Sequence, residues 1–285
     1  MSDLTRDLPE LKNRGLFRRS RPEQPMASGN APARLRVVDG PSDFDPAPAG
    51  GYTDDWENLR AVSPGRNSAI VNRLGNAAND PVAASFDRLR TSLLKGLRAN
   101  GWNRVAVVAP TMGCGATFSA INLAMSLSQI PGSRTLLMDL NLRRPGLASA
   151  LDMKGTGDMR GFLTGQAHLQ DQFVRAGDTL ALGLTQAPDA DAAHLLNSEG
   201  AAFAINDAMD RLSPDVMLCD LPPLLEHDDL AAFLPQVDGV LLVADGNQTL
   251  PDHIAACERS LENQTRVLGV ILNQARLSGP APMFA

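Results

Sequence analysis

The sequence predicts an α/β fold in which a doubly wound, mostly parallel sheet carries helices on both faces. Two observations predict it. Six short, continuous apolar runs alternate with segments of helical periodicity, and a glycine-containing turn joins the first run directly to a helix. Continuous apolar runs of strand length are typical of parallel strands covered on both faces. A strand, a glycine turn and a helix in this order form the layout of a phosphate-binding P-loop, so we expect a P-loop NTPase-like domain.

The hydrophobic pattern places the elements along the chain. The predicted strands are residues 105–109, 134–139, 179–185, 215–220, 239–244 and 267–272. The predicted helices are residues 81–100, 117–127, 199–212 and 251–263, with short helical pieces near 157–163 and 168–174. The first helix has clear boundaries, because Asp80 can cap it, Pro81 suits its first position and Gly101 follows its end.

Composition divides the chain into three parts. Residues 1–78 carry recurrent prolines and no lasting periodicity, which predicts a disordered tail. Residues 79–277 form the predicted globular domain, and residues 278–285 a short loose end. The tail begins basic, which suits a contact with anionic lipid or with an acidic partner loop, although a plain solvated tail has the same composition. Trp56 stands with Tyr52 in GGYTDDWENLRAV, a candidate docking segment.

Charge and cysteine content narrow the function classes. The 285 residues carry a net charge of −6, which argues against an electrostatic nucleic-acid binder. No apolar run is long enough to span a membrane and the first residues lack a signal-peptide core, so we expect a cytoplasmic protein. Cys114, Cys219 and Cys257 are widely spaced, which predicts neither a disulfide framework nor a zinc site. Redox sensing at Cys114 is an alternative to a plain loop residue, because a helix start can lower a thiol pKa.

The glycine turn departs from the P-loop pattern G-x-x-x-x-G-K-[ST] at its charged position. Gly115 and Thr117 match the second glycine and the threonine, whereas Ala116 replaces the lysine and Pro110 the first glycine. Backbone N–H groups of such a loop can still cradle a phosphate, although the usual cation is missing. The predicted nucleotide contacts are Gly113, Cys114, Gly115, Ala116, Thr117 and Phe118.

Two acidic residues end predicted strands beside this loop. Asp220 ends strand 215–220, where a Walker-B acid holds Mg²⁺ through water, so Thr117 and Asp220 are the predicted metal site. Asp139 ends strand 134–139 at the edge where α/β sheets bind ligands. Asp139 and Asp220 are therefore the candidate catalytic residues, and the alternative for Asp220 is a strand-end acid that caps a turn.

Five segments in order resemble bacterial tyrosine kinases (BY-kinases, CpsD/CapB type) over about residues 82–276. These are P-loop proteins related to the MinD and ParA ATPases and tied to capsule and exopolysaccharide export. The segments are SFDRLRTSL (family FRxLRTNL), APTMGCGATFSAINLA (SxxPGEGKSxxxxNLA), RTLLMDLNLRRPGL (LLIDxDxRxP), CDLPPLLEHDDL (IDTPPxxxxxDA), and VDGVLLV with VLGVILNQ. The resemblance places Asp229 on a family aspartate and Asn273 on a base-contacting asparagine. It implies Mg-ATP or Mg-ADP as cofactor.

Several residues differ from the family pattern at positions that contribute to the family's chemistry. Besides Ala116 for the lysine, Asn141 replaces the second Walker A′ aspartate, and Thr111 stands where MinD-like loops carry their signature lysine. A charge-assisted hydrogen bond contributes about 1.5–3 kcal/mol, so the missing lysine could weaken triphosphate binding by about one to two decades. Arg143 and Arg144 are candidates for a substitute cation, with plain surface arginines as the alternative.

Two further sequence features of the family are only partly kept or missing. The oligomerising ExxRxxR pattern falls on Ala84, Asp87 and Arg90, so only its last residue is kept. The family's C-terminal tyrosine cluster is absent, because Tyr52 is the only tyrosine in the sequence. Autophosphorylation of a tyrosine tail is therefore not expected.

The resemblance, taken with these departures, implies a degenerate BY-kinase-like protein that acts as partner or regulator in capsular or exopolysaccharide biosynthesis and export. It would dock on a membrane-anchored polysaccharide co-polymerase (Wzz-type) or a BY-kinase activator, at the inner face of the plasma membrane. One alternative is an active tyrosine kinase or ATPase with a lysine-free P-loop, and another is a ParA/MinD-like positioning ATPase. Homo-oligomerisation stays open, and no nucleic-acid partner is expected.

Overall fold

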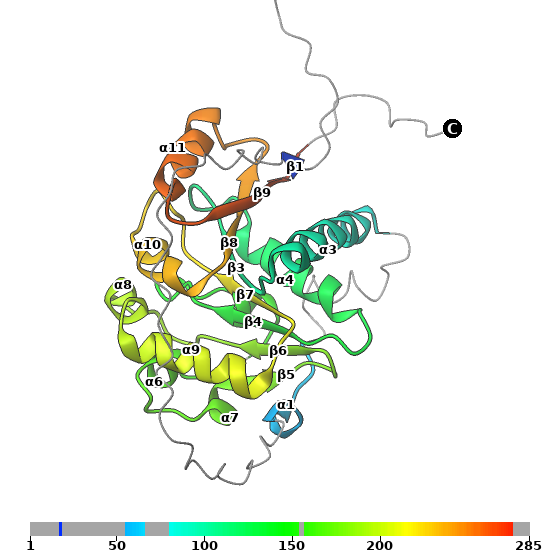
Figure 1. Ribbon diagram of the computed structural model, residues 1–285, viewed down its shortest axis with the longest axis vertical. Helices are drawn as coiled ribbons and strands as arrows, with labels where there is room; N and C mark the ends of the chain where they lie inside the picture. Colours follow the sequence, from blue (N-terminus) through cyan, green and yellow to red (C-terminus); the bar gives the residue numbers. More distant parts are fainter. Residues whose placement is uncertain (1–16, 19–54, 66–79, 154–156, 276–285) are drawn as a thin grey trace, which may run out of the picture.

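A single sheet of nine strands forms the centre of the computed structural model, which describes residues 17–18, 55–65, 80–153 and 157–275 (Figure 1). The strands are β1 (Phe17–Arg18), β2 (Arg60–Ala61), β3 (Arg104–Val108), β4 (Thr135–Asp139), β5 (Phe173–Arg175), β6 (Leu180–Gly183), β7 (Val216–Asp220), β8 (Gly239–Asp245) and β9 (Arg266–Asn273). Their order in the sheet is β1-β9-β8-β3-β7-β4-β6-β5-β2. The six strands from β9 to β6 are mutually parallel, as predicted, whereas β1 and β5 run antiparallel to their neighbours β9 and β6.

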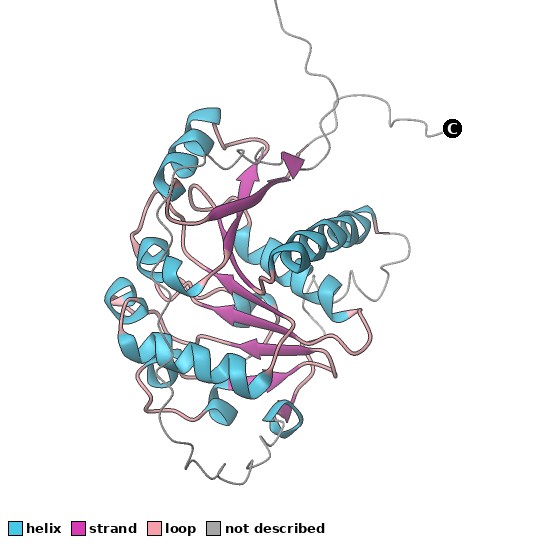
Figure 2. Ribbon diagram, in the orientation of Figure 1, coloured by secondary structure: helices cyan, strands magenta, loops and turns pink. Residues whose placement is uncertain are grey.

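Helices cover both faces of the sheet, so the predicted doubly wound α/β architecture is confirmed (Figures 1 and 2). One face carries α3 (Pro81–Asn100), α4 (Ala116–Ser128) and α5 (Leu147–Ala150). The other carries α6 (Met159–Leu163), α8 (Ala192–Leu196), α9 (Glu199–Leu212), α10 (Asp229–Phe233), a 3-10 turn η2 (Leu234–Gln236) and α11 (Pro251–Leu261). Two one-turn helices, α1 (Asp55–Asn58) and α7 (Leu169–Gln172), lie near the β5 edge.

The predicted helix boundaries follow from local chemistry. The Asp80 side chain accepts a hydrogen bond from the Val82 N–H at 2.9 Å, and Gly101 ends α3 in the left-handed conformation at φ 68°. The apolar face of α3 is buried against α4. Arg90 also ties the two helices together, because its Nη1 donates to the Ser126 carbonyl at 2.6 Å and pairs with Asp87 at 3.0 Å. The surviving residue of the oligomerising pattern therefore makes contacts within its own chain.

The second short piece predicted as helical, residues 168–174, ends in a strand instead. Helix α7 stops at Gln172, and β5 then pairs antiparallel with β6. The partner residue of Phe173 is Gly183, and a Cβ there would lie 2.6 Å from the Phe173 ring. The aromatic ring therefore fills the space that the glycine leaves open, which a helical-periodicity argument does not detect.

Residues 55–65, which we call the edge strap, lie within the segment predicted to be disordered, and for these residues that prediction is wrong. Trp56 is fully buried, and its indole Nε1 donates to the Asp178 carbonyl at 2.9 Å. The Arg134 guanidinium lies 5.2 Å from the indole ring, within cation–π distance. Strand β2 then pairs parallel with β5 and extends the sheet by one strand. The rest of the predicted tail apart from β1, together with Tyr52 and the predicted loose end 278–285, lies outside the described residues.

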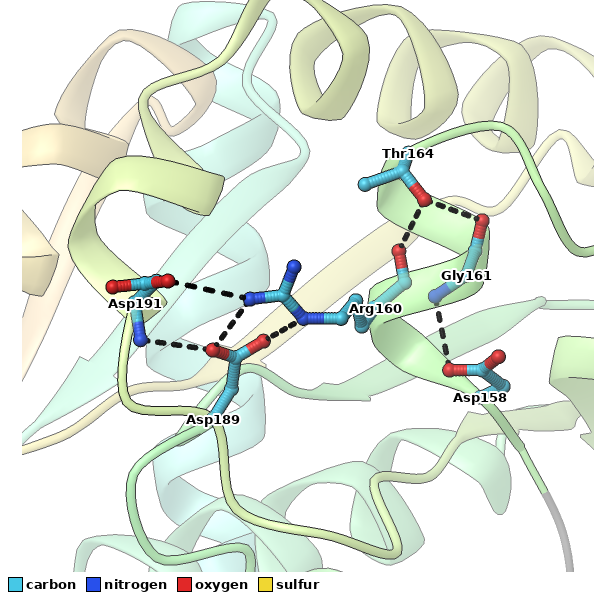
Figure 3. A network of polar contacts seen from close by, with 6 residues as sticks. All are labelled: Asp158, Arg160, Gly161, Thr164, Asp189 and Asp191. Carbon is cyan, nitrogen blue, oxygen red and sulfur yellow. Dashed lines mark hydrogen bonds and ion pairs between the residues drawn. The ribbon is translucent and has the colours of Figure 1, made fainter.

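A polar network joins α6 to the loop before α8 (Figure 3). Two nitrogens of the Arg160 guanidinium donate to the Asp189 carboxylate, Nε to Oδ2 at 2.5 Å and Nη2 to Oδ1 at 2.8 Å. The guanidinium lowers the pKa of the Asp189 carboxyl, and the same carboxylate accepts the Asp191 N–H at 2.8 Å. The network therefore connects two short elements on the α9 face of the sheet.

None of the helices that the structure describes has the length and apolarity needed to cross a membrane.

Candidate nucleotide-binding site

The glycine turn connects the end of β3 to the start of α4. Gly113 and Gly115 adopt left-handed φ values of 87° and 89°, which only glycine takes without strain. A Cβ at Gly115 would also lie 2.2 Å from Asn273 Nδ2, so the loop leaves no room for a side chain there. The amide of Asn273 donates to the Cys114 carbonyl at 2.9 Å and holds the loop against the end of β9. These contacts give the loop one defined conformation.

A cavity of about 320 Å³ opens above this loop at the carboxyl edge of the sheet. Three segments line it: the loop itself, the connection between β4 and α5, and the connection between β7 and α10. The lining residues are Ala109, Thr111 to Thr117, Asn141, Arg143, Arg144, Leu221 to Pro223, Glu226 and His227. The predicted loop contacts Gly113 to Thr117 therefore all lie in one cavity, at the edge where α/β sheets bind ligands.

The loop presents backbone donors to this cavity. In the described part of the chain, the N–H groups of Gly113 through Thr117 donate to no protein acceptor. Met112 differs, because its N–H donates to Glu226 Oε1 at 2.7 Å. Sequence reasoning missed Glu226, which lies six residues after Asp220 and reaches the loop only through the fold. The loop can therefore still hold an anion through main-chain donors, and one of them already holds a carboxylate.

The two predicted catalytic acids lie side by side. Asp139 and Asp220 are register partners at the ends of the adjacent parallel strands β4 and β7, and both are fully buried. The Thr117 hydroxyl donates to Asp220 Oδ2 at 2.6 Å. Asp139 Oδ2 accepts the N–H groups of Gly146 and Leu147 at 3.1 and 3.0 Å. The other oxygen of each carboxylate has no partner among the described residues.

Burial dominates the protonation of this pair. Desolvation raises the pKa of Asp139 to about 7, against the lowering effect of its backbone hydrogen bonds. Desolvation also raises the pKa of Asp220 well above its usual range, and the nearby Asp139 charge raises it further. Two adjacent buried carboxyls do not both ionise readily, so the pair retains at least one proton near neutral pH. A bound cation would reverse this balance.

The residues present fit a Mg²⁺-nucleotide in part. The Thr117 hydroxyl and the Asp220 carboxylate offer the hard oxygen atoms that Mg²⁺ prefers, and each of the two acids has one oxygen without a partner among the described residues. Magnesium, when bound, would neutralise phosphate charge there. The cationic half of the site does not fit, because Ala116 begins α4 with a methyl group in place of an ammonium.

The two arginines of the β4–α5 connection have different surroundings. Arg143 Nε forms an ion pair at 2.8 Å with Asp229, whose side chain is fully buried. Arg143 thus neutralises a buried carboxylate and ties the cavity wall to α10. Arg144 is exposed, and its Nη1 contacts the Met112 sulfur. No carboxylate of the described residues pairs with Arg144.

Two of the other predicted residues, Phe118 and Asn273, are not among the lining residues, and the Cys114 side chain is buried although Cys114 belongs to the lining. The Phe118 ring packs edge-on against Phe86 of α3 with ring centroids 6.3 Å apart, so its side chain contributes to the packing of α4 on α3. Asn273 contacts the loop through the hydrogen bond from its amide to the Cys114 carbonyl. Cys114 is 1% exposed, and its sulfur lies 3.6 Å from the Thr111 hydroxyl and 3.5 Å from that of Thr249. Its side chain therefore packs under the loop.

Comparisons with known proteins agree with this geometry. No protein-family model matches the chain. The tyrosine-protein kinase YwqD of Bacillus subtilis is 28% identical over 177 residues, which cover 61% of this chain and 73% of YwqD. The crystal structure of the VpsO kinase domain is 27% identical, superposes with a TM-score of 0.60, and covers 72% of this chain and 97% of that domain.

In sequence and in fold, the chain is similar to bacterial tyrosine kinases.

The likeness to BY-kinases spans most of the described domain. The kinase domain of the Escherichia coli tyrosine kinase ETK superposes with a TM-score of 0.64 over 73% of this chain and 82% of that domain; at 22% identity it supports the fold alone. EpsB of Ralstonia nicotianae is 28% identical over 202 residues, covering 68% of this chain but only 26% of EpsB. The chain therefore spans about a quarter of that relative's length. The resemblance to BY-kinases predicted from the sequence is confirmed.

Proposed function

We propose that this chain is a catalytically degraded BY-kinase relative that acts as a non-enzymatic partner or regulator in exopolysaccharide biosynthesis and export. One observation carries the proposal: Ala116 begins α4 in a cavity that retains Thr117 and the loop's main-chain donors, with Thr117 bonded to the buried Asp220. The process is inferred from relatives, among them ExoP of Rhizobium meliloti, a succinoglycan biosynthesis transport protein that is 28% identical over 183 residues. These residues cover 61% of this chain and 22% of ExoP.

The substitutions in the cavity are expected to lower the reaction rate strongly while leaving the fold intact. A donor that stabilises transition-state charge is worth about 10²–10³ in rate, which is what the missing lysine removes. Asn141 lines the cavity without a carboxylate that could orient a nucleophile or accept its proton. The partner we propose is a membrane-anchored polysaccharide co-polymerase or a BY-kinase activator, which would place the chain at the inner face of the plasma membrane.

An active kinase or ATPase that works in trans is the second candidate. The observation in its favour is the preserved Thr117–Asp220 hydrogen bond at 2.6 Å, which a site with no remaining use for Mg²⁺ would not need. A ParA/MinD-like positioning ATPase is the weakest reading, because the loop carries neither the P-loop lysine nor the signature lysine at Thr111.

Turnover of ATP and transfer to a tyrosine polymer separate these functions. We expect the purified chain to show no turnover above the Asp220→Asn variant. We expect Ala116→Lys to tighten Mg-ADP binding by about one to two decades in calorimetry, because it restores a charge-assisted hydrogen bond. Ala84→Lys, on the exposed side of α3, is the charge-matched control. Tyrosine phosphorylation that Asp220→Asn abolishes would overturn the non-enzymatic function.

A further inference from the structure

Two charged side chains outside the P-loop meet at one loop residue, Met112. Glu226 Oε1 accepts the Met112 N–H at 2.7 Å, and Arg144 Nη1 contacts the Met112 sulfur. Both side chains are exposed and both line the cavity that contains the loop donors. They come from different connections, one after β4 and one after β7, so only the fold brings them together.

We propose that Arg144 supplies the cation that the loop lacks at Ala116, and that Glu226 is an internal anion which a phosphate group must displace. The ligand class is a Mg²⁺-bound nucleotide polyphosphate or pyrophosphate. The inference rests on the cavity being the ligand site of the proposed function, and it is independent of whether that site catalyses a reaction.

The surroundings of the two arginines assign this role to Arg144. Arg143 is committed to Asp229, and removing it would leave a fully buried carboxylate unpaired, which is strongly destabilising. Arg144 has no carboxylate partner in the described part of the chain, so its charge is available to an anion. Its planar fork can donate two parallel hydrogen bonds to phosphate oxygens, which an ammonium group cannot do. Arg144 lines the same cavity as Gly113 to Thr117, so an anion held by the main-chain donors would share that cavity with the Arg144 guanidinium.

Glu226 occupies one of the loop's own donors. The Met112 N–H donates to a carboxylate, so it can bind an anion. The same N–H cannot donate to a phosphate at the same time. The negative charge of Glu226 would also repel a phosphate held by the neighbouring N–H groups. A phosphate that enters the cavity therefore displaces the Glu226 carboxylate from the Met112 N–H, and Arg144 then lies beside the phosphate.

A second, independent observation points to a ligand in this place. Asp139 Oδ1 and Asp220 Oδ1 are buried and unpartnered among the described residues, and the other oxygen of Asp220 accepts a hydrogen bond from Thr117, which lines the cavity. Such oxygens are costly unless something bridges them, and hydrated Mg²⁺ carried by a polyphosphate would do so.

Calorimetry on the full chain tests the proposal, with Mg-ADP and Mg-pyrophosphate as probes. We expect Arg144→Gln to weaken binding of both by about 10–100-fold, because a charge-assisted donor is lost. Glu226→Ala should tighten binding at least threefold, and Glu226→Gln, which keeps an acceptor without the charge, should fall between it and the wild type. Arg88→Gln removes the same charge from the exposed side of α3 and should leave both affinities unchanged, because among the described residues Arg88 bonds only to Ser85.

Several outcomes would overturn the inference. They are an Arg144→Gln affinity within threefold of wild type, an equal loss in Arg88→Gln, an affinity unaltered by Glu226→Ala, or no binding by either wild type or Glu226→Ala at millimolar probe. Its failure is distinguishable from failure of the proposed function. Turnover that depends on Asp220 would refute the non-enzymatic role while leaving the Arg144 result intact, and an unaffected Arg144→Gln would do the reverse.

Discussion

Replacing Trp56 with alanine is expected to lower the free energy of unfolding by about 3–5 kcal/mol, the usual cost of removing a fully buried large aromatic side chain. The indole is completely buried at the β5 edge of the sheet, donates to the Asp178 carbonyl and lies under the Arg134 guanidinium. Its loss leaves a cavity and one unpaired carbonyl, and it also weakens the docking of β2. Urea unfolding followed by circular dichroism measures the change.

A matched control and a local readout make this prediction specific. Phe203→Ala removes an aromatic side chain that is 75% exposed on α9, and it should change stability by less than about 0.5 kcal/mol. In the Trp56 variant, hydrogen exchange should accelerate at the Val62 N–H, which donates to the Arg175 carbonyl at 2.8 Å. Unchanged stability and unchanged exchange at Val62 would contradict the assignment of the edge strap to the folded domain.

Stability should depend on pH through the buried acid pair, and Asp139→Asn should reveal it. The folded protein keeps a proton on Asp139 up to a pKa of about 7, whereas the unfolded chain releases it near 3.8. The folded state therefore binds more protons between these values, and the contribution of this group to stability is complete below pH 3.8 and lost as pH rises to about 7. The loss is at most about 4 kcal/mol.

The variant mimics the protonated acid, so it should be close to wild type at pH 4 and more stable than wild type at pH 7. Magnesium-free buffer with chelator keeps a cation from reversing the effect. Asp252→Asn, on the exposed first turn of α11, is the charge-matched control and should show no comparable divergence with pH. A constant difference between Asp139→Asn and wild type from pH 4 to 7 would contradict the shifted pKa.

The centre of the fold was predictable because its signals are local. The six parallel strands are continuous apolar runs, and α3 and α9 have the bounds expected from their periodicity and caps. The P-loop was recognisable because Gly113 and Gly115 are required by the backbone conformation itself. Asp139 and Asp220 could be placed at one edge of the sheet in advance because parallel strands end at a common edge, whereas their direct pairing follows from the strand order.

Other features depended on partners that the sequence does not specify locally. Strand β5 exists because its three residues pair with β6, and Trp56 is a core residue because the far edge of the sheet receives it. The same applies to the charges around the site: Glu226 meets Met112 across 114 positions of sequence, and Arg143 meets Asp229 across 86.

Periodicity, glycine positions and motif residues are properties of short segments, so the amino-acid order was enough to predict the P-loop α/β domain, its resemblance to BY-kinases and the missing lysine. Three features followed only from the packing of distant segments: which arginine pairs with a buried carboxylate, which one contacts the loop, and which acid accepts a hydrogen bond from a loop N–H group. Charge pairing depends on distances between side chains and on their burial, and both arise only when distant segments pack together.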